Sequence, residues 1–112
     1  MKKVSKTERI RQLNDNFRRY GIGNGEIYIS SGVAALSDED IFRLQQEVRN
    51  YEDFSKDNDP YREHDFGSID FKKEKYFFKI DYYDKTRTFL SPNPADPDCT
   101  LRVLTIFHAD EY

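Results

Sequence analysis

The chain has very little of what stabilises small secreted proteins or anchors proteins in membranes. Cys99 is the only cysteine among 112 residues, so no disulfide can form within the chain. Disulfides are common in secreted proteins and rare in the cytosol. No apolar run opens the sequence, and none elsewhere approaches the length of about 18 residues that indicates a membrane span. These absences predict a soluble protein of the cytoplasm.

Tryptophan is absent as well, but the other aromatic residues are plentiful. Nine Phe and eight Tyr bring the aromatic fraction to 15%, whereas disordered chains contain few aromatic residues. A chain of this length buries roughly two-thirds of its unfolded surface on folding. We therefore predict a single domain, residues 1–112, whose core needs neither a disulfide nor a metal. We expect no cofactor.

Charge is distributed unevenly along the chain, whose formal net charge is -3. Residues 1–20 carry seven Lys/Arg against two acidic residues, whereas residues 38–65 carry ten Asp/Glu against four Lys/Arg. Nucleic-acid-binding domains are more often basic overall, so direct binding of DNA or RNA is not expected. Two interpretations of the acidic segment 38–65 stay open: an ordinary solvated surface, and a surface that attracts a basic partner over long range.

Two segments have the pattern of amphipathic helices. Ser5 and Glu8 have the spacing of a capping box at the start of a helix over residues 5–20. A second helix, over residues 38–52, begins after Ser37 with three acidic residues that the helix dipole favours. Apolar residues at three- and four-residue steps give the first helix its predicted buried stripe, which is Ile10, Leu13, Phe17 and Tyr20.

The rest of the chain has the two-residue period of strands, interrupted by turns. This order of segments predicts an α+β fold, in which the two N-terminal helices pack on one face of a mostly antiparallel sheet of four or five strands. The segments expected after and between the helices are a strand over 26–31, a loop over 53–65, and strands over 66–71, 75–83, 86–90 and 101–107.

The stretch NDPYREHDFG, residues 58–67, gathers the residues that most suggest chemistry. A calcium loop that starts at Asp53 lacks the glycine needed at its sixth position and the glutamate needed at its twelfth. A transition-metal site needs at least three converging ligands. Glu63, His64 and Asp65 are adjacent, so their side chains diverge unless the backbone turns sharply. We predict no metal site.

A catalytic interpretation of this motif remains open. The unperturbed pKa of a histidine side chain suits a general base, and His64 is flanked by two carboxylates. In a small hydrolase or nuclease-like enzyme of this kind, acidic and basic residues of the strand over 75–83 would lie opposite the motif. The candidate catalytic residues are Glu63, His64, Asp65, Lys79 and Asp81.

A structural interpretation competes with it. Asp59 precedes Pro60, and the residue before a proline is driven out of the helical region, which favours a turn. Gly67 closes the motif at the point where the chain enters the strand expected over 66–71. In this interpretation Gly67 takes a backbone conformation closed to other residues, and the motif is a shaped turn that leads into the sheet.

Four motifs in this order, NDPYREHDFG, FFKIDYYD, SPNPADPDCT and RVLTI, make the chain resemble a known family. It is similar to the bacterial domain-of-unknown-function family 3768, found largely on plasmids, phages and other mobile DNA. The family has no established activity, so no catalytic role transfers, and the chain departs from its pattern at His108, where an apolar residue is usual. The resemblance runs from Asn14 to Tyr112, and the matching positions are Asn58, Asp59, Pro60, Glu63, His64, Asp65, Phe66, Gly67, Lys79, Asp81, Tyr82, Tyr83, Asp84, Ser91, Pro92, Pro94, Asp96 and Pro97.

The resemblance implies a small accessory protein that blunts a host defence such as restriction or CRISPR. Together with the acidic segment 38–65 and the Tyr-rich strands, it leads us to expect a protein that binds a macromolecular partner without catalysis. The expected partner is a basic, nucleic-acid-binding defence complex. The residues expected to contact it are Asp57, Asp59, Glu63, Tyr82 and Tyr83.

Overall fold

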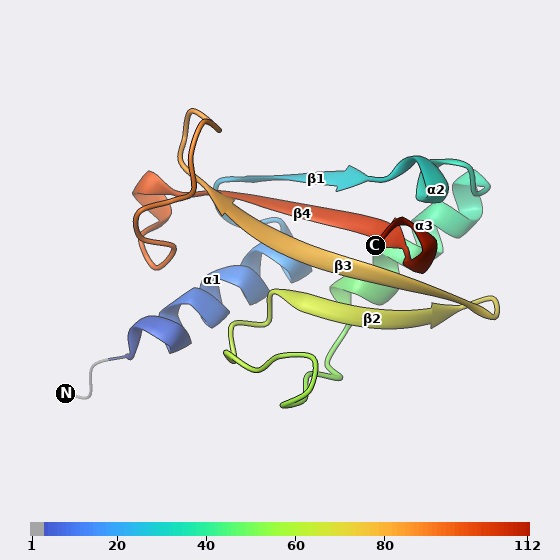
Figure 1. Ribbon diagram of the computed structural model, residues 1–112, viewed down its shortest axis with the longest axis horizontal. Helices are drawn as coiled ribbons and strands as arrows, with labels where there is room; N and C mark the ends of the chain where they lie inside the picture. The colour runs from blue at the N-terminus through green and yellow to red at the C-terminus, as the bar shows by residue number, and fades with distance from the viewer. Residues whose placement is uncertain (1–3) are drawn as a thin grey trace.

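The computed structural model describes residues 4–112 and contains two longer helices and one four-stranded sheet (Figure 1). The first helix, α1, spans Lys6–Tyr20. It begins as the capping pattern predicts, because Ser5 Oγ accepts a hydrogen bond from the Glu8 amide at 3.1 Å. It ends at Gly21, whose φ of 70° is the left-handed conformation that commonly terminates helices.

The buried side of α1 is partly polar, which the apolar stripe does not predict. Ile10 and Phe17 are buried as expected, but Tyr20 is 68% exposed, so its assignment to the stripe is wrong. Asn14 and Arg18 are buried instead. Two polar side chains on the inner side of a helix must find partners there, because burying an unpaired polar group is costly.

The chain then forms a short strand and two helices. Strand β1 spans Gly25–Ile29 and is shorter than expected, because a one-turn helix that the sequence pattern does not predict, α2, begins directly after it and spans Ser31–Ala34. Helix α3 spans Asp38–Arg49. Its start is as predicted, with Ser37 Oγ accepting from the Asp40 amide at 3.1 Å, but it ends three residues before residue 52.

Three further strands complete a mixed sheet. They are β2 (Phe66–Phe71), β3 (Glu74–Tyr83) and β4 (Leu101–His108), and the strand order is β1-β4-β3-β2. The pairs β2–β3 and β3–β4 are antiparallel, but β1 is parallel to β4, so the expectation of a mostly antiparallel sheet is wrong. The helices carry the chain from one edge of the sheet to the other, and two reversals then bring β4 back beside β1 in the same direction.

The strand expected over residues 86–90 is absent. Leu90 forms only an isolated bridge with Tyr83. The reason is a local turn, in which Asp84 Oδ1 accepts hydrogen bonds from the Thr88 amide at 3.0 Å and the Thr86 hydroxyl at 2.9 Å. Side-chain bonds of this kind offer the backbone an alternative to a sheet ladder.

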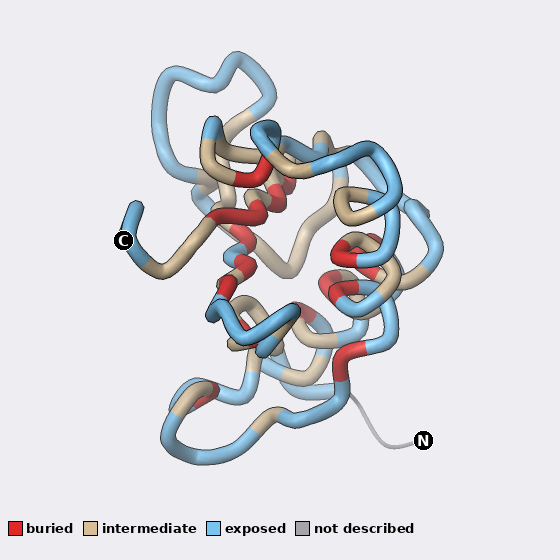
Figure 2. The backbone as a smooth tube through the Cα atoms, turned by 90° about the vertical axis from the view of Figure 1, so that its right-hand side faces the viewer, coloured by how far each residue is buried: buried red, intermediate tan, exposed pale blue. Residues whose placement is uncertain are grey.

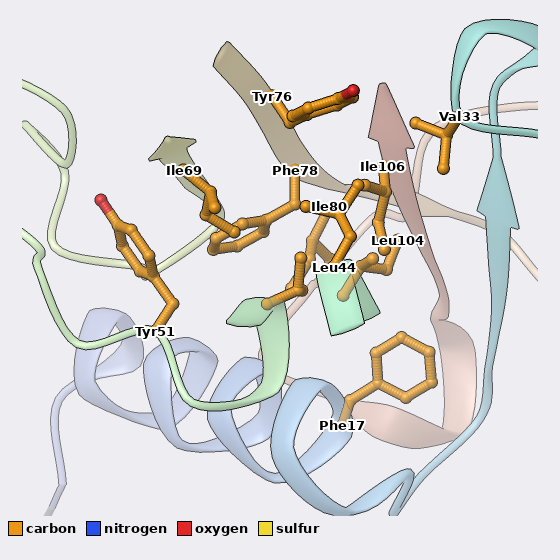
Figure 3. Packing of buried hydrophobic residues seen from close by; sticks show 11 residues of the cluster. Phe17, Val33, Leu44, Tyr51, Ile69, Tyr76, Phe78, Ile80, Leu104 and Ile106 are labelled. Atoms are coloured by element: carbon orange, nitrogen blue, oxygen red, sulfur yellow. The ribbon is translucent and has the colours of Figure 1, made fainter. Parts of the chain in front are cut away.

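The hydrophobic core combines side chains from the helices and the strands. Figure 3 shows them gathered between α1, α3 and the sheet. Figure 2 shows most of the buried residues in the interior of the fold, with exposed loops around them. The buried members of the cluster are Phe17, Val33, Leu44, Val48, Tyr51, Ile69, Tyr76, Phe78, Ile80, Leu104 and Ile106.

Short 3-10 turns flank β4: η1 (Pro97–Cys99) and η2 (Ala109–Glu111). The second turn brings Tyr112 against the side of the sheet opposite the hydrophobic core. The ring of Tyr112 approaches those of Phe66, Phe77 and Phe107, with centroid distances of 6.5, 5.5 and 6.1 Å.

No helix within residues 4–112 is both long and apolar enough to cross a membrane.

Candidate functional site

Asp59 organises the motif at residues 58–67. Its side chain is 5% exposed, and Oδ1 accepts hydrogen bonds from the backbone amides of Glu63 and His64, both at 3.1 Å. Arg62 and His64 have φ values of 61° and 57°, a left-handed conformation that costs about 1–2 kcal/mol for a residue with a Cβ. The buried carboxylate therefore holds a strained turn in place and fixes the directions of the side chains that follow.

His64 lies between two carboxylates and against an aromatic ring. Its Nδ1 is 2.9 Å from Oδ1 of Asp15 on α1, and its Nε2 is 3.7 Å from Oδ2 of Asp59. The imidazole stacks on the ring of Phe54, with 3.8 Å between centroids and 3° between planes. These contacts fasten the motif to α1 and to the preceding loop.

The backbone and side chain of Glu63 belong to a second polar group, centred on Asn14 of α1. Asn14 Nδ2 donates to the Glu63 carbonyl at 2.9 Å and to the Tyr82 hydroxyl at 2.8 Å. The Tyr82 hydroxyl donates to Glu63 Oε1 at 2.8 Å, and Arg102 Nε donates to Asn14 Oδ1 at 2.7 Å. We call these four residues, Asn14, Glu63, Tyr82 and Arg102, the Asn14 network.

Burial sets the ionisation of the Asn14 network. Desolvation raises the pKa of Tyr82, so the phenol keeps the proton that it donates to Glu63. Desolvation also lowers the pKa of Arg102, but an arginine in a protein stays charged. The guanidinium of Arg102 lies 5.4 Å from the centroid of the Tyr82 ring, which gives the buried cation a favourable aromatic contact.

The candidate catalytic residues lie near one another, but the structure does not bond His64 to the others. Within residues 4–112, no hydrogen bond or ion pair joins the His64 side chain to Glu63, Asp65, Lys79 or Asp81. Lys79 Nζ instead lies 3.3 Å from Asp81 Oδ2 along β3. Acid–base catalysis needs its groups within mutual reach of a substrate. The part of the chain that the structure describes also contains no group of three or more His, Cys, Asp or Glu side chains that could hold a metal.

Comparison with known proteins gives a family for this chain. A family model described as "Protein of unknown function (DUF3768)" matches residues 29–111. The chain belongs to the DUF3768 family. Searches of curated proteins and of solved structures found no significant match. The DUF3768 match contains Glu63, Tyr82 and Arg102, whereas Asn14, which joins them, lies before its first residue.

The residues expected to contact a partner lie in different environments in this DUF3768 protein. Asp59 is buried and bound to backbone amides, so it is not available to a partner. Glu63 and Tyr82 are half-buried in the Asn14 network. Asp57 is exposed, and Tyr83 is half-buried at the end of β3. Of the five residues, Asp57 and Tyr83 are the two whose side chains are neither buried in the motif nor part of the Asn14 network.

Sequence reasoning missed the polar residues of α1. Asn14 makes the hydrogen bonds described above, and Arg18 Nη1 donates to the carbonyls of Val48 and Arg49 at 2.8 and 3.0 Å, which joins α1 to the end of α3. A signal was present, because position 14 lies four residues after Ile10 and three before position 17, on the buried stripe of the helix. A polar residue at such a position indicates a buried hydrogen-bond network.

Asp65 provides a test of the electrostatics at the motif. Burial, followed by the charge of Glu63, raises the pKa of Asp65 to about 6. The unfolded carboxyl has the lower pKa, so ionisation of Asp65 opposes folding as the pH rises from about 4 through 6. We expect Asp65→Asn to raise the thermal unfolding midpoint at pH 7, and the gain to vanish below about pH 4.

The control for this prediction is Asp70→Asn, which removes an exposed carboxylate from the far end of β2. It should change the midpoint little at either pH, as surface substitutions usually do. Unfolding curves of the three proteins at several pH values provide the comparison. A gain from Asp65→Asn that is the same at about pH 4 and pH 7 contradicts the electrostatic explanation.

Proposed function

We propose that this protein acts by binding a macromolecular partner, without catalysis, through the side of the sheet that faces away from α1 and α3. The observation that carries this proposal is a hollow of about 530 Å³ on that side, lined by aromatic and polar side chains. Among the described residues, the helical residues that line this hollow belong to α2 and η2, each of which is a single turn. We call this side of the sheet the outer face and define it by Phe66, Phe77, Lys79, Thr105, Phe107 and Tyr112.

Aromatic side chains suit the outer face to binding. Phe66, Phe77 and Phe107 form a contiguous group, with centroid distances of 5.3 Å between Phe66 and Phe77 and 5.7 Å between Phe77 and Phe107. Tyr112 packs against them while it remains 84% exposed. Tyrosine and phenylalanine are enriched at protein interfaces, where a few such anchors contribute most of the binding energy.

The proposed partner is basic, of the kind that the family resemblance implies: a nucleic-acid-binding complex of a host defence system, which this protein inhibits. The charge of the acidic segment 38–65, whose exposed carboxylates lie outside the outer face, supports this choice through long-range attraction. Attraction between acidic and basic surfaces speeds association and weakens as salt is added. The acidic residues of the segment that are exposed are Asp38, Glu39, Glu47, Glu52, Asp53 and Asp57.

A small hydrolase or nuclease-like enzyme is the second candidate. The raised pKa of Asp65 favours it, because perturbed carboxyl groups are common at catalytic sites. The contacts of the His64 side chain argue against it, since its ring is bound by Asp15 and stacked on Phe54 rather than bonded to the other candidate residues. We therefore rank binding first.

Affinity capture tests the proposed function. A tagged chain is incubated with a lysate of its host, and the retained proteins are identified by mass spectrometry. We expect a basic partner whose recovery falls as salt increases, and falls by roughly tenfold when Phe66 and Tyr112 are both changed to alanine. The matched control is Phe42→Ala on α3, which removes an aromatic ring that is 60% exposed outside the outer face.

Two results contradict the proposal. One is that the unmodified chain retains no partner. The other is that the Phe66→Ala, Tyr112→Ala double variant and Phe42→Ala retain the same amount of it. Circular dichroism establishes beforehand that both variants fold.

A further inference from the structure

A second hollow, of about 660 Å³, lies between α1 and the loop that precedes β2. Arg11 lines it from α1, and Lys56, Arg62 and His64 line it from the loop. Phe54, stacked on the imidazole, forms part of the wall. We call the four residues Arg11, Lys56, Arg62 and His64 the basic groove.

Two cations of the basic groove, Lys56 and Arg62, are not neutralised by their neighbours, whereas His64 lies between the carboxylates of Asp15 and Asp59. Among the residues that the structure describes, the side chains of Lys56 and Arg62 have no partner in an ion pair or hydrogen bond, and the ion pair of Arg11 is a contact of 3.8 Å with the half-exposed Glu8. The carboxylate that lines the groove, Asp59, is 5% exposed and its Oδ1 is bound to backbone amides. A concave site with cations of this kind attracts an anion, even in a chain whose net charge is -3.

Contacts with α1 and with Asp59 fix the backbone of the groove. Arg62 has a φ of 61°, its amide donates to the Asp59 carbonyl at 3.1 Å, and its own carbonyl accepts from Arg11 Nη1 at 3.1 Å. Left-handed residues with a Cβ persist only where surrounding contacts enforce them, and they cluster at ligand sites. The backbone that carries the cations is therefore held in position before a ligand arrives.

We propose that the basic groove binds the phosphate group of a small phosphate monoester. Guanidinium groups present paired N–H donors that match phosphate oxygens, and a lysine adds a point charge. Arg11, Lys56 and Arg62 supply three positive charges, which suit a phosphate dianion better than a carboxylate ligand with one negative charge. This site is separate from the outer face and does not rest on the proposed function.

An adjoining hollow accommodates the organic part of the ligand. It has a volume of about 440 Å³, shares Arg11, Pro60 and Arg62 with the basic groove's hollow, and is also lined by Tyr61. The Tyr61 residue is 76% exposed, so its ring is free to stack on a planar group. The ligand thus extends from the cations toward Tyr61.

Titration calorimetry in a phosphate-free buffer of low salt tests this inference with inorganic phosphate, adenosine 5′-monophosphate and adenosine as probes. We expect the two phosphates to bind and adenosine not to bind. Arg62→Gln and Lys56→Gln should each weaken binding of the nucleotide by roughly tenfold, because each removes a charged donor. The matched control, Lys85→Gln, removes an exposed cation from the loop after β3 and should leave binding unchanged.

Folding does not complicate these variants, because the side chains of Lys56 and Arg62 form no bond with the rest of the described chain; equal thermal midpoints establish this. No saturable binding of either phosphate up to about 10 mM overturns the proposal. The proposal is also overturned if Arg62→Gln and Lys56→Gln leave the affinity for the nucleotide unchanged. A nucleotide that binds no more tightly than inorganic phosphate supports the phosphate site and overturns the role of Tyr61.

Discussion

Replacing Asn14 by alanine is expected to lower the free energy of unfolding by about 3 kcal/mol. The substitution removes the acceptor of Arg102 Nε and the donor to the Glu63 carbonyl and the Tyr82 hydroxyl. Asn14 is 0% exposed and Arg102 is 3% exposed, so water does not replace the lost bonds freely. Arg102 keeps its bond to the Pro94 carbonyl, at 2.6 Å, which prevents a larger loss.

Equilibrium unfolding in urea measures this effect, and Asn16→Ala provides its control. Asn16 lies on the exposed side of the same helix, and its side chain makes no hydrogen bond within residues 4–112. Alanine is the better helix former at both positions, so the difference between the variants isolates the network. We expect Asn16→Ala to stay within about 0.5 kcal/mol of the unmodified chain. Equal effects of the two substitutions are incompatible with a stabilising Asn14 network.

Local features of the fold were predictable from the sequence, because their causes lie within a few residues. Ser5 and Ser37 cap the helices that they were expected to cap. The hairpin of β2 and β3 follows from the two-residue period. The prediction of a strand over 86–90 was wrong for an equally local reason, because the Asp84 side chain accepts a hydrogen bond from the Thr88 amide and so stabilises a turn.

Long-range features were not predictable in this way. The parallel pairing of β1 with β4 joins segments about 77 positions apart, as in the pair Ile27 and Leu104. Asn14 is likewise separated from Tyr82 by 68 positions and from Arg102 by 88. The periodicity of apolar residues within one segment does not indicate which distant segment it contacts.

The candidate site shows the same division. The motif was recognisable from its composition, but the direction of each side chain depends on the left-handed backbone at Arg62 and His64. An arginine gives no sequence signal for this conformation, which Asp59 enforces through its bonds to the amides of the turn. The sequence alone therefore leaves open both a catalytic cluster and a shaped turn.

Gly67→Ala is the second substitution with a large expected effect, a loss of about 2–3 kcal/mol. The sequence suggested that Gly67 is required for an unusual backbone conformation, and this is wrong, because it is an ordinary residue of β2 without a positive φ. Space is the actual reason. A Cβ at this position would lie 2.7 Å from Phe78 Cζ and 2.8 Å from Tyr51 Cε2. Both rings belong to the core, so neither moves freely.

A double-mutant cycle with Phe78→Leu identifies this crowding directly. Leucine removes the ring atoms that the new methyl group meets. The free energy of unfolding lost by the double variant should therefore be smaller than the sum of the two single losses by at least about 1 kcal/mol. Ser68→Ala, at the next position of β2, is the matched control and should show no such coupling with Phe78→Leu. Strictly additive losses for Gly67→Ala and Phe78→Leu would mean that the backbone, and not the close approach of the Phe78 ring, demands glycine where the motif enters the sheet.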